Sequence, residues 1–205
     1  MRKCALFSLK NNYSISPDFQ SIKKGEKVSD RLVWHSCREG NKKALESIYD
    51  SNYNLLLNVG FKIVPILEVV EDHIQDLFLY IWKNRTSIEI KSNMRVYLLK
   101  SLRNNLIKYA QKTRNLTSDE HLNHIPENTI ENQNEFGGDE LKVLVDNLPQ
   151  KQMEIIYLKF FQNFEGAEIA EIMNISIGTA YNLLSRAIRN LKKNAGLLTV
   201  FCIFI

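Results

Sequence analysis

Apolar residues recur along most of the chain at the three- and four-residue spacing of an α-helix. The clearest helix is predicted from about Val70 to Lys83, where apolar positions fall at i, i+3, i+4, i+7 and i+8 and form one stripe. These positions are Ile74, Leu77, Phe78, Ile81 and Trp82. Few segments alternate with a period of two, so the pattern predicts an all-α protein.

Two more helical stretches are predicted in the same half of the chain. One begins near Ala44 and continues past Val59, and we expect Gly60 and the stretch to Pro65 to interrupt it. The other runs from about Asn93 to Lys112. Its core-facing positions are Val96, Leu99, Leu102, Leu106 and Tyr109.

Residues 164–187 have the pattern of a helix-turn-helix. Ile169, Ala170 and Met173 would bury a first short helix, residues 174–176 would form the turn, and Ser176 would cap the second helix. A plain helical hairpin is the alternative. In a helix-turn-helix, the outer face of the second helix enters the major groove. The residues predicted on this face are Tyr181, Asn182, Ser185, Arg186 and Arg189.

Composition divides the chain into five parts. A basic arm over residues 1–28, predicted to be disordered, precedes a helical domain over 29–114. Residues 115–139 carry six acidic and no basic side chains, and they predict a flexible acidic linker. A second helical domain follows over 140–194, and an apolar tail over 195–205. We therefore expect two small helical domains joined by this linker.

The overall composition excludes several classes of protein. With 8 Gly and 4 Pro in 205 residues, long helices are favoured over a turn-rich sandwich or barrel. Cys4, Cys37 and Cys202 lack metal-ligand spacing, and we expect a cytoplasmic protein with reduced cysteines. No motif for catalysis, phosphate binding or metal binding is present. We thus expect neither an enzyme nor a cofactor, metal or small-molecule substrate.

Charge is more informative where it is concentrated than in the net value of +4. Residues 91–114 contain seven basic and no acidic side chains, with Asn93, Tyr97, Asn104, Asn105 and Tyr109 between them. Basic side chains attract phosphates, and amides and aromatic rings bond or stack with exposed bases. The helix at 93–112 is therefore a candidate nucleic-acid surface, with a solvated charged face as the alternative.

The helix at 70–83 also has a second face. Asp72, Gln75, Asp76 and Leu79 recur at i, i+3, i+4 and i+7, away from the apolar stripe. An ordinary solvated face is the simpler explanation for such a pattern on one helix.

In their order, these segments resemble the extracytoplasmic-function sigma factors, the small two-domain specificity subunits of bacterial RNA polymerase. The resemblance covers about Asp30 to Lys193. It includes the opening helix over residues 40–49, the segment EDHIQDLFLYIW at 71–82 and the run at 97–104. It continues at Leu148-Pro149 and through the helix-turn-helix at 168–187. Departures such as Asp76 for a common Glu and Lys108 for a frequent Asp remove no required group.

The resemblance implies a role for each surface. The polar strip of Asp72, Gln75, Asp76 and Leu79 would bind the coiled coil of the large subunit of core RNA polymerase. The linker would thread the RNA exit path, an anti-sigma factor would hold the chain inactive, and polymerase would supply the catalysis. A non-template base would be flipped into a loop at about residues 84–92. The −10 element would be gripped by Asn93, Arg95, Tyr97, Lys100, Arg103, Asn104 and Lys108, and the −35 duplex read by Ser176, Thr179, Tyr181, Asn182, Ser185, Arg186 and Arg189.

Two other functions remain open at this point. A stand-alone helix-turn-helix regulator would explain residues 140–194 but not the polar strip at 72–79. A protein-sequestering adaptor would need no DNA contact by Arg186.

Overall fold

The computed structural model describes residues 30–90, 93–116, 145 and 147–194, and every regular element among them is helical. The predicted all-α class is confirmed. A first helical group comprises α1 (Asp30–Arg38), α2 (Lys42–Ile63), α3 (Leu67–Asn84) and α4 (Met94–Leu116). A second helical group comprises α6 (Gln150–Ile156) with the π-helical turn η3 (Tyr157–Phe161), α7 (Gly166–Met173) and α8 (Ile177–Asn194).

Local sequence sets the ends of α2. The Asn41 side chain accepts hydrogen bonds from the backbone N–H groups of Lys43 and Ala44, which caps the first turn. At the other end, Val64 is extended, the conformation favoured before a proline such as Pro65.

The expected interruption at Gly60 is wrong, because α2 continues through this glycine to Ile63. Gly60 is buried where α2 crosses α3 and α4. A Cβ atom there would lie 2.5 Å from Val70 Cγ1 and 3.3 Å from Leu106 Cδ1. Glycine therefore permits a close helix crossing at this position and does not break the helix.

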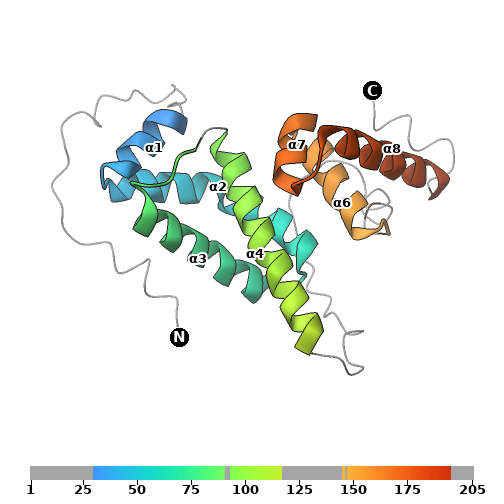
Figure 1. The fold of residues 1–205 in the computed structure, drawn as a ribbon, viewed down its shortest axis with the longest axis horizontal. Coiled ribbons are helices and arrows are strands. Elements are labelled where there is room, and N and C mark those ends of the chain that lie inside the picture. The colour runs from blue at the N-terminus through green and yellow to red at the C-terminus, as the bar shows by residue number, and fades with distance from the viewer. Residues whose placement is uncertain (1–29, 91–92, 117–144, 146, 195–205) are drawn as a thin grey trace.

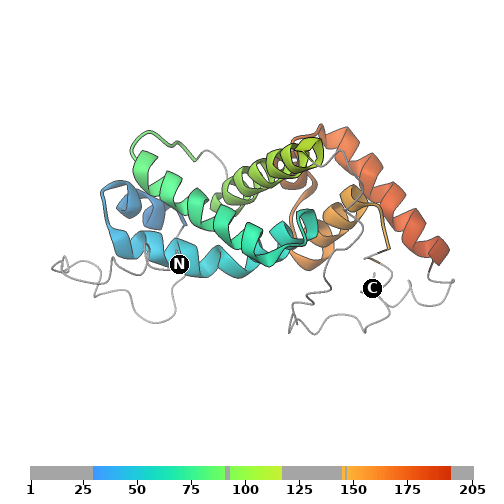
Figure 2. The same cartoon turned by 90° about the horizontal axis from the view of Figure 1, so that it is seen from below.

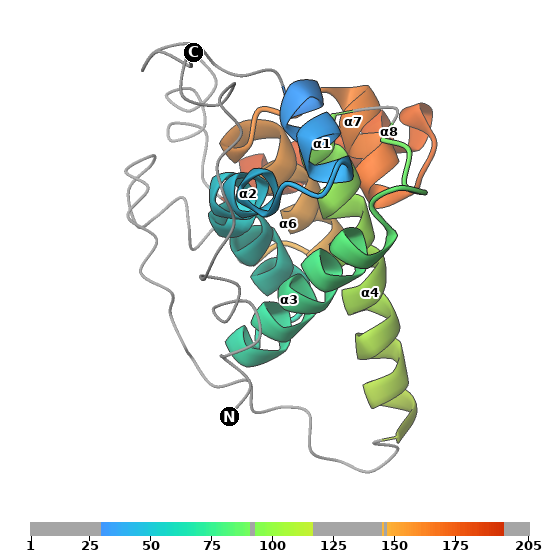
Figure 3. The ribbon, with the colours of Figure 1, turned by 90° about the vertical axis from the view of Figure 1, so that its left-hand side faces the viewer.

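Helix α4 lies between the two helical groups (Figure 1). It contacts α2 and α3 on one side and α7 on the other, while α6 contacts α2. Figure 2 shows α8 at the end of the molecule away from α1, and Figure 3 shows the C-terminal part of α4 extending beyond its neighbours. The buried residues form one continuous hydrophobic cluster that includes both groups. The two groups thus pack against each other.

The helix-turn-helix forms as predicted. Ile169, Ala170 and Met173 are buried, and α7 is followed by its C-cap Asn174, which takes the left-handed conformation with φ 54°. Ser176 Oγ accepts a hydrogen bond of 3.1 Å from the backbone N–H of Thr179, as an N-cap side chain does.

Other predictions lie partly or wholly outside the described residues. The N-terminal arm over 1–28 and the tail over 195–205 fall there, as does the acidic linker except for Asn115 and Leu116, which continue α4. Among the helices that the structure describes, none is both long enough and apolar enough to cross a lipid bilayer.

Candidate nucleic-acid interface

The outer face of α8 is open to solvent. Tyr181 is 58% exposed, and the other four residues predicted for this face, Asn182, Ser185, Arg186 and Arg189, are exposed as well. The opposite face carries Ala180, Ala187 and Leu191, which are buried. A helix anchored on one side, with amide, hydroxyl, phenol and guanidinium groups on the other, can enter a major groove.

Contacts within the helix-turn-helix hold two further predicted residues in place. Ser176 Oγ lies 2.8 Å from Thr179 Oγ1, so these hydroxyls bond each other at the start of α8. Tyr181 leans on the first turn of α7, where a Cβ at Gly166 would lie 3.0 Å from the Tyr181 hydroxyl oxygen. The absence of a side chain at Gly166 therefore leaves room for the phenol.

The residues predicted to contact the −10 element do not form one surface. Tyr97, Asn104 and Lys108 recur at i, i+7 and i+11, so they share the side of α4 on which Lys108 is exposed. Burial, followed by the nearby Tyr80, raises the pKa of Tyr97, so its phenol remains uncharged at neutral pH. Asn93 is exposed, but its side chain accepts a hydrogen bond of 2.9 Å from the Arg95 backbone N–H.

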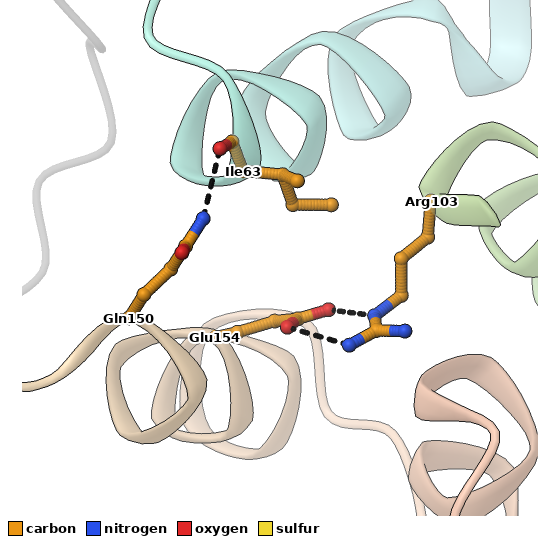
Figure 4. A network of polar contacts seen from close by, with 4 residues as sticks. All are labelled: Ile63, Arg103, Gln150 and Glu154. Atoms are coloured by element: carbon orange, nitrogen blue, oxygen red, sulfur yellow. Dashed lines mark hydrogen bonds and ion pairs between the residues drawn. The ribbon is translucent and has the colours of Figure 1, made fainter. Parts of the chain in front are cut away.

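Arg103 lies on a different side of α4 and is buried against the second helical group. Its guanidinium donates from Nε to Glu154 Oε1 at 2.5 Å and from Nη2 to Glu154 Oε2 at 3.2 Å (Figure 4). Arg103 is 7% exposed and Glu154 4% exposed. Close by, Gln150 Nε2 donates to the carbonyl oxygen of Ile63 at 2.8 Å and joins α6 to the last turn of α2.

Two other basic residues of α4 also contact the second group. The Arg95 guanidinium lies 5.1 Å from the centre of the Phe164 ring, a cation–π arrangement. Lys100 Nζ lies 3.6 Å from Glu171 Oε1 on α7. Arg95, Lys100 and Arg103 thus bind protein groups in this structure.

The polar strip predicted at Asp72, Gln75, Asp76 and Leu79, called the α3 strip from here on, lies on the side of α3 away from its buried apolar stripe. Asp72 and Asp76 are exposed, Gln75 is half-buried, and Leu79 is 45% exposed. Ile74, Leu77, Phe78 and Ile81 are buried, as the sequence predicts. The strip combines two carboxylates with an exposed leucine, a composition that suits a partner with basic and apolar side chains.

The loop before α4 is described as far as Ile90. Arg85 stacks 4.4 Å above the centre of the Trp82 ring and donates to the Trp82 carbonyl oxygen at 2.9 Å. Arg38 donates from Nη2 to the Thr86 carbonyl oxygen at 3.1 Å. These contacts tie the described part of the loop to α1 and α3.

Sequence reasoning missed the partners of the α4 side chains. Glu154 was identifiable only as an acidic residue between apolar ones, and its partner is 51 positions away. Phe164 stood at the edge of the helix-turn-helix with no signal of its contact to Arg95. Among the described residues, no three His, Cys, Asp or Glu side chains lie close enough together to hold a metal ion.

Comparisons with known proteins agree with this architecture. Residues 138–191, about a quarter of the chain, match the family described as Sigma-70, region 4. No curated protein matches the chain.

Solved structures with the same fold cover most of the chain. The sigma factor RpoE from Bartonella quintana, solved with the anti-sigma factor NepR, is 21% identical with a TM-score of 0.57, over 85% of this chain and 95% of that chain. CnrH, solved with the cytosolic domain of CnrY, is 15% identical with a TM-score of 0.57, over 80% of this chain and 96% of that chain. Residues 138–191 are thus similar to sigma-70 region 4, and the chain shares the fold of RpoE and CnrH over most of its length.

Proposed function

We propose that the chain directs core RNA polymerase to promoters through three surfaces: the α3 strip, α4 and the outer face of α8. The observation that carries this proposal is the exposed outer face of α8 within a region 4 domain. The chain supplies binding and recognition in the cytoplasm, while polymerase supplies the chemistry.

Reading of the −35 duplex is assigned to the outer face of α8. Arg186 can donate two parallel hydrogen bonds to a guanine, and Asn182 can bond an adenine in a similar way. Arg189 lies one turn further along the helix and would add a phosphate contact. Ser176 and Thr179 stand at the N-terminus of α8, where a backbone phosphate is favourably bound.

Capture of the −10 strand is assigned to α4. Tyr97 offers a ring for stacking, Asn104 an amide for a base edge, and Lys108 a charge for the backbone. Arg95, Lys100 and Arg103 would add to this surface once they leave their protein partners. The cost of unstacking a flipped base is a few kcal/mol, which these contacts must offset.

Core polymerase binding is assigned to the α3 strip. Asp72 and Asp76 would pair with basic side chains of the large-subunit coiled coil, and Leu79 would bury its exposed surface against it. An anti-sigma factor is a further proposed partner, because RpoE of the same fold was solved with one.

The experiment compares two acidic pairs with the same i, i+4 spacing. In Asp72→Ala/Asp76→Ala the α3 strip loses both charges, and we expect core affinity to fall about tenfold or more. Glu46→Ala/Asp50→Ala removes an exposed pair from α2 and should bind core as the unmodified chain does. Co-elution on gel filtration and fluorescence titration give the affinities.

Equal core binding by both double variants would contradict the assignment of the α3 strip. If no form of the chain binds core polymerase while each binds duplex DNA tightly, the stand-alone regulator is the better description.

A further inference from the structure

We propose that the free sigma factor is held in a self-inhibited closed form by the buried Arg103–Glu154 ion pair, which keeps Arg95, Lys100 and Arg103 of α4 from the −10 strand. This inference rests on the proposed function, since it takes α4 to be the −10 surface.

Three of the four basic residues predicted for the −10 contact are engaged with the second helical group. Arg103 donates hydrogen bonds to Glu154, Lys100 forms an ion pair with Glu171, and the Arg95 guanidinium makes a cation–π contact with Phe164. Lys108 is exposed on another side of α4. Neutralisation of DNA phosphates by basic side chains supplies much of the affinity of a protein for nucleic acid. The closed form therefore lacks the contribution of the three residues that contact the second helical group.

DNA binding and closure cannot use Arg103 together. With Glu154 on its Nε and Nη2 atoms and 7% of the residue exposed, the guanidinium has no open path to a phosphate or base. A strand could reach it only after α6 and α7 have moved from α4. The exposed outer face of α8 takes no part in the contact, so closure blocks the −10 surface and leaves the −35 surface free.

The second helical group is shaped to make this contact. The π-helical turn η3 is followed by Asn163 with a positive φ of 56°, and the Phe164 backbone N–H donates to the Leu158 carbonyl oxygen at 3.0 Å. This bend buries the Phe164 ring beneath Arg95. Glu165 then begins α7 with a capping box completed by Glu168.

A buried ion pair is well suited to a reversible closure. Its net contribution to stability is small, because burying two charges costs about as much as their attraction returns. Loss of one partner is far more costly, because the other charge stays buried and unpaired. The contact should therefore open when polymerase binds, and a single substitution should also open it.

The test measures the distance between the two helical groups in the full-length chain. Spin labels are placed at the exposed positions Lys43 on α2 and Ala167 on α7, with Cys4 and Cys202 changed to Ser. The unmodified pair should give one narrow distance distribution. Glu154→Gln should give a broader and longer distribution, whereas Glu46→Gln, at an exposed site on α2, should leave it narrow.

Exchanging the charges of Arg103 and Glu154 shows whether a broad distance distribution comes from opening of the closed form or from misfolding of the variant. Arg103→Glu should open the chain by placing two carboxylates together, and Arg103→Glu/Glu154→Arg should restore the narrow distribution. Circular dichroism melting confirms that each variant is folded. A distribution that is as narrow in Glu154→Gln and in Arg103→Glu as in the unmodified chain would overturn the proposal, as would a broad distribution in the unmodified chain.

Binding of a fluorescent single-stranded oligonucleotide of mixed sequence, at fixed salt, supplies the functional readout. The Glu154→Gln variant, without polymerase, should bind the oligonucleotide about tenfold more tightly than the unmodified chain does. The reason is that a larger fraction of its molecules is in the open form that can bind DNA. The exchanged double variant should bind it weakly. If the distances between the labels change as predicted but no form of the chain binds core or the oligonucleotide, the closed form is supported and the proposed function is contradicted. Unchanged distances in a chain that does bind core would instead refute the closed form alone.

Discussion

At the residue scale, the type of a side chain indicates whether it could contact DNA, and its burial determines whether it is available to do so. Arg186 and Arg189 are exposed on α8, as their positions in the helical pattern predict. Arg103 has the same chemistry and is buried, because Glu154 offers a fork of two oxygens that matches its guanidinium. The pattern of residues along the helix that contains Arg103 gives no information on Glu154, which lies on another helix.

Replacing Arg186 by Ala should weaken binding of the polymerase holoenzyme to a −35 duplex by about 1–3 kcal/mol, or about 5- to 150-fold, through loss of a two-point base contact. Fluorescence anisotropy at constant salt measures the effect. Arg31→Ala removes the same group from an exposed site on α1 and should change little. If both variants lost a similar amount of affinity for the duplex, the effect of Arg186 would come from the net charge of the chain and not from a base contact.

Cys37 should be a slow nucleophile in the folded chain. Burial raises the pKa of its thiol from about 9 to about 11, and the nearby Arg85 only partly opposes this shift. At pH 8 the thiolate fraction is then about 100-fold below that of an ordinary cysteine. A Cys4→Ser/Cys202→Ser variant tests this with a thiol reagent. Reaction at the same rate before and after unfolding in urea would contradict the burial.

The same shift gives a pH dependence of stability. In the unfolded chain the thiol loses its proton near pH 9, whereas the folded chain retains it until about pH 11. The free energy of unfolding should therefore decrease across this interval by up to about 2–3 kcal/mol more in the unmodified chain than in Cys37→Ala. Urea titrations of both proteins at several pH values measure this difference, and parallel pH profiles would contradict the pKa shift.

At the element scale, periodicity predicted the helices better than it predicted their breaks. The apolar stripe of α3 and the helix-turn-helix were both placed correctly, because each has a regular core face and the latter a clear cap at Ser176. Gly60 was misinterpreted as an interruption. The reason for a glycine at this position is its close approach to Val70 and Leu106, which belong to other helices. The sequence around Gly60 gives no sign of these contacts.

Substitution of Gly60 by Ala should destabilise the protein by about 1–3 kcal/mol. The added methyl group would lie 2.5 Å from Val70 Cγ1, which forces α2 and α3 apart. Gly178→Ala is the matched control, because nothing lies within 4 Å of a Cβ there and alanine favours a helix by up to about 1 kcal/mol. Urea denaturation should give opposite signs, and equal effects would contradict the close crossing.

At the scale of the whole molecule, the sequence predicted two helical domains but not how they meet. Gln150 joins the last turn of α2, and Arg103 and Glu154 join α4 to α6 across a gap of 51 positions. Contacts between distant segments depend on packing geometry, and single-sequence periodicity has no information on it. The continuous core across both groups is therefore the main finding that only the structure provides.

Run-off transcription with purified core polymerase, on DNA from upstream of the chain's own gene, tests the proposed function in one reaction. We expect a discrete start site with the unmodified chain and loss of that product with Asp72→Ala/Asp76→Ala or Arg186→Ala, whereas Glu46→Ala/Asp50→Ala should retain it. Gel filtration in parallel covers the case of a sigma factor that does not serve its own promoter. Absence of both a transcript and co-elution with core, together with tight binding of duplex DNA by the free chain, would contradict the proposed sigma-factor function.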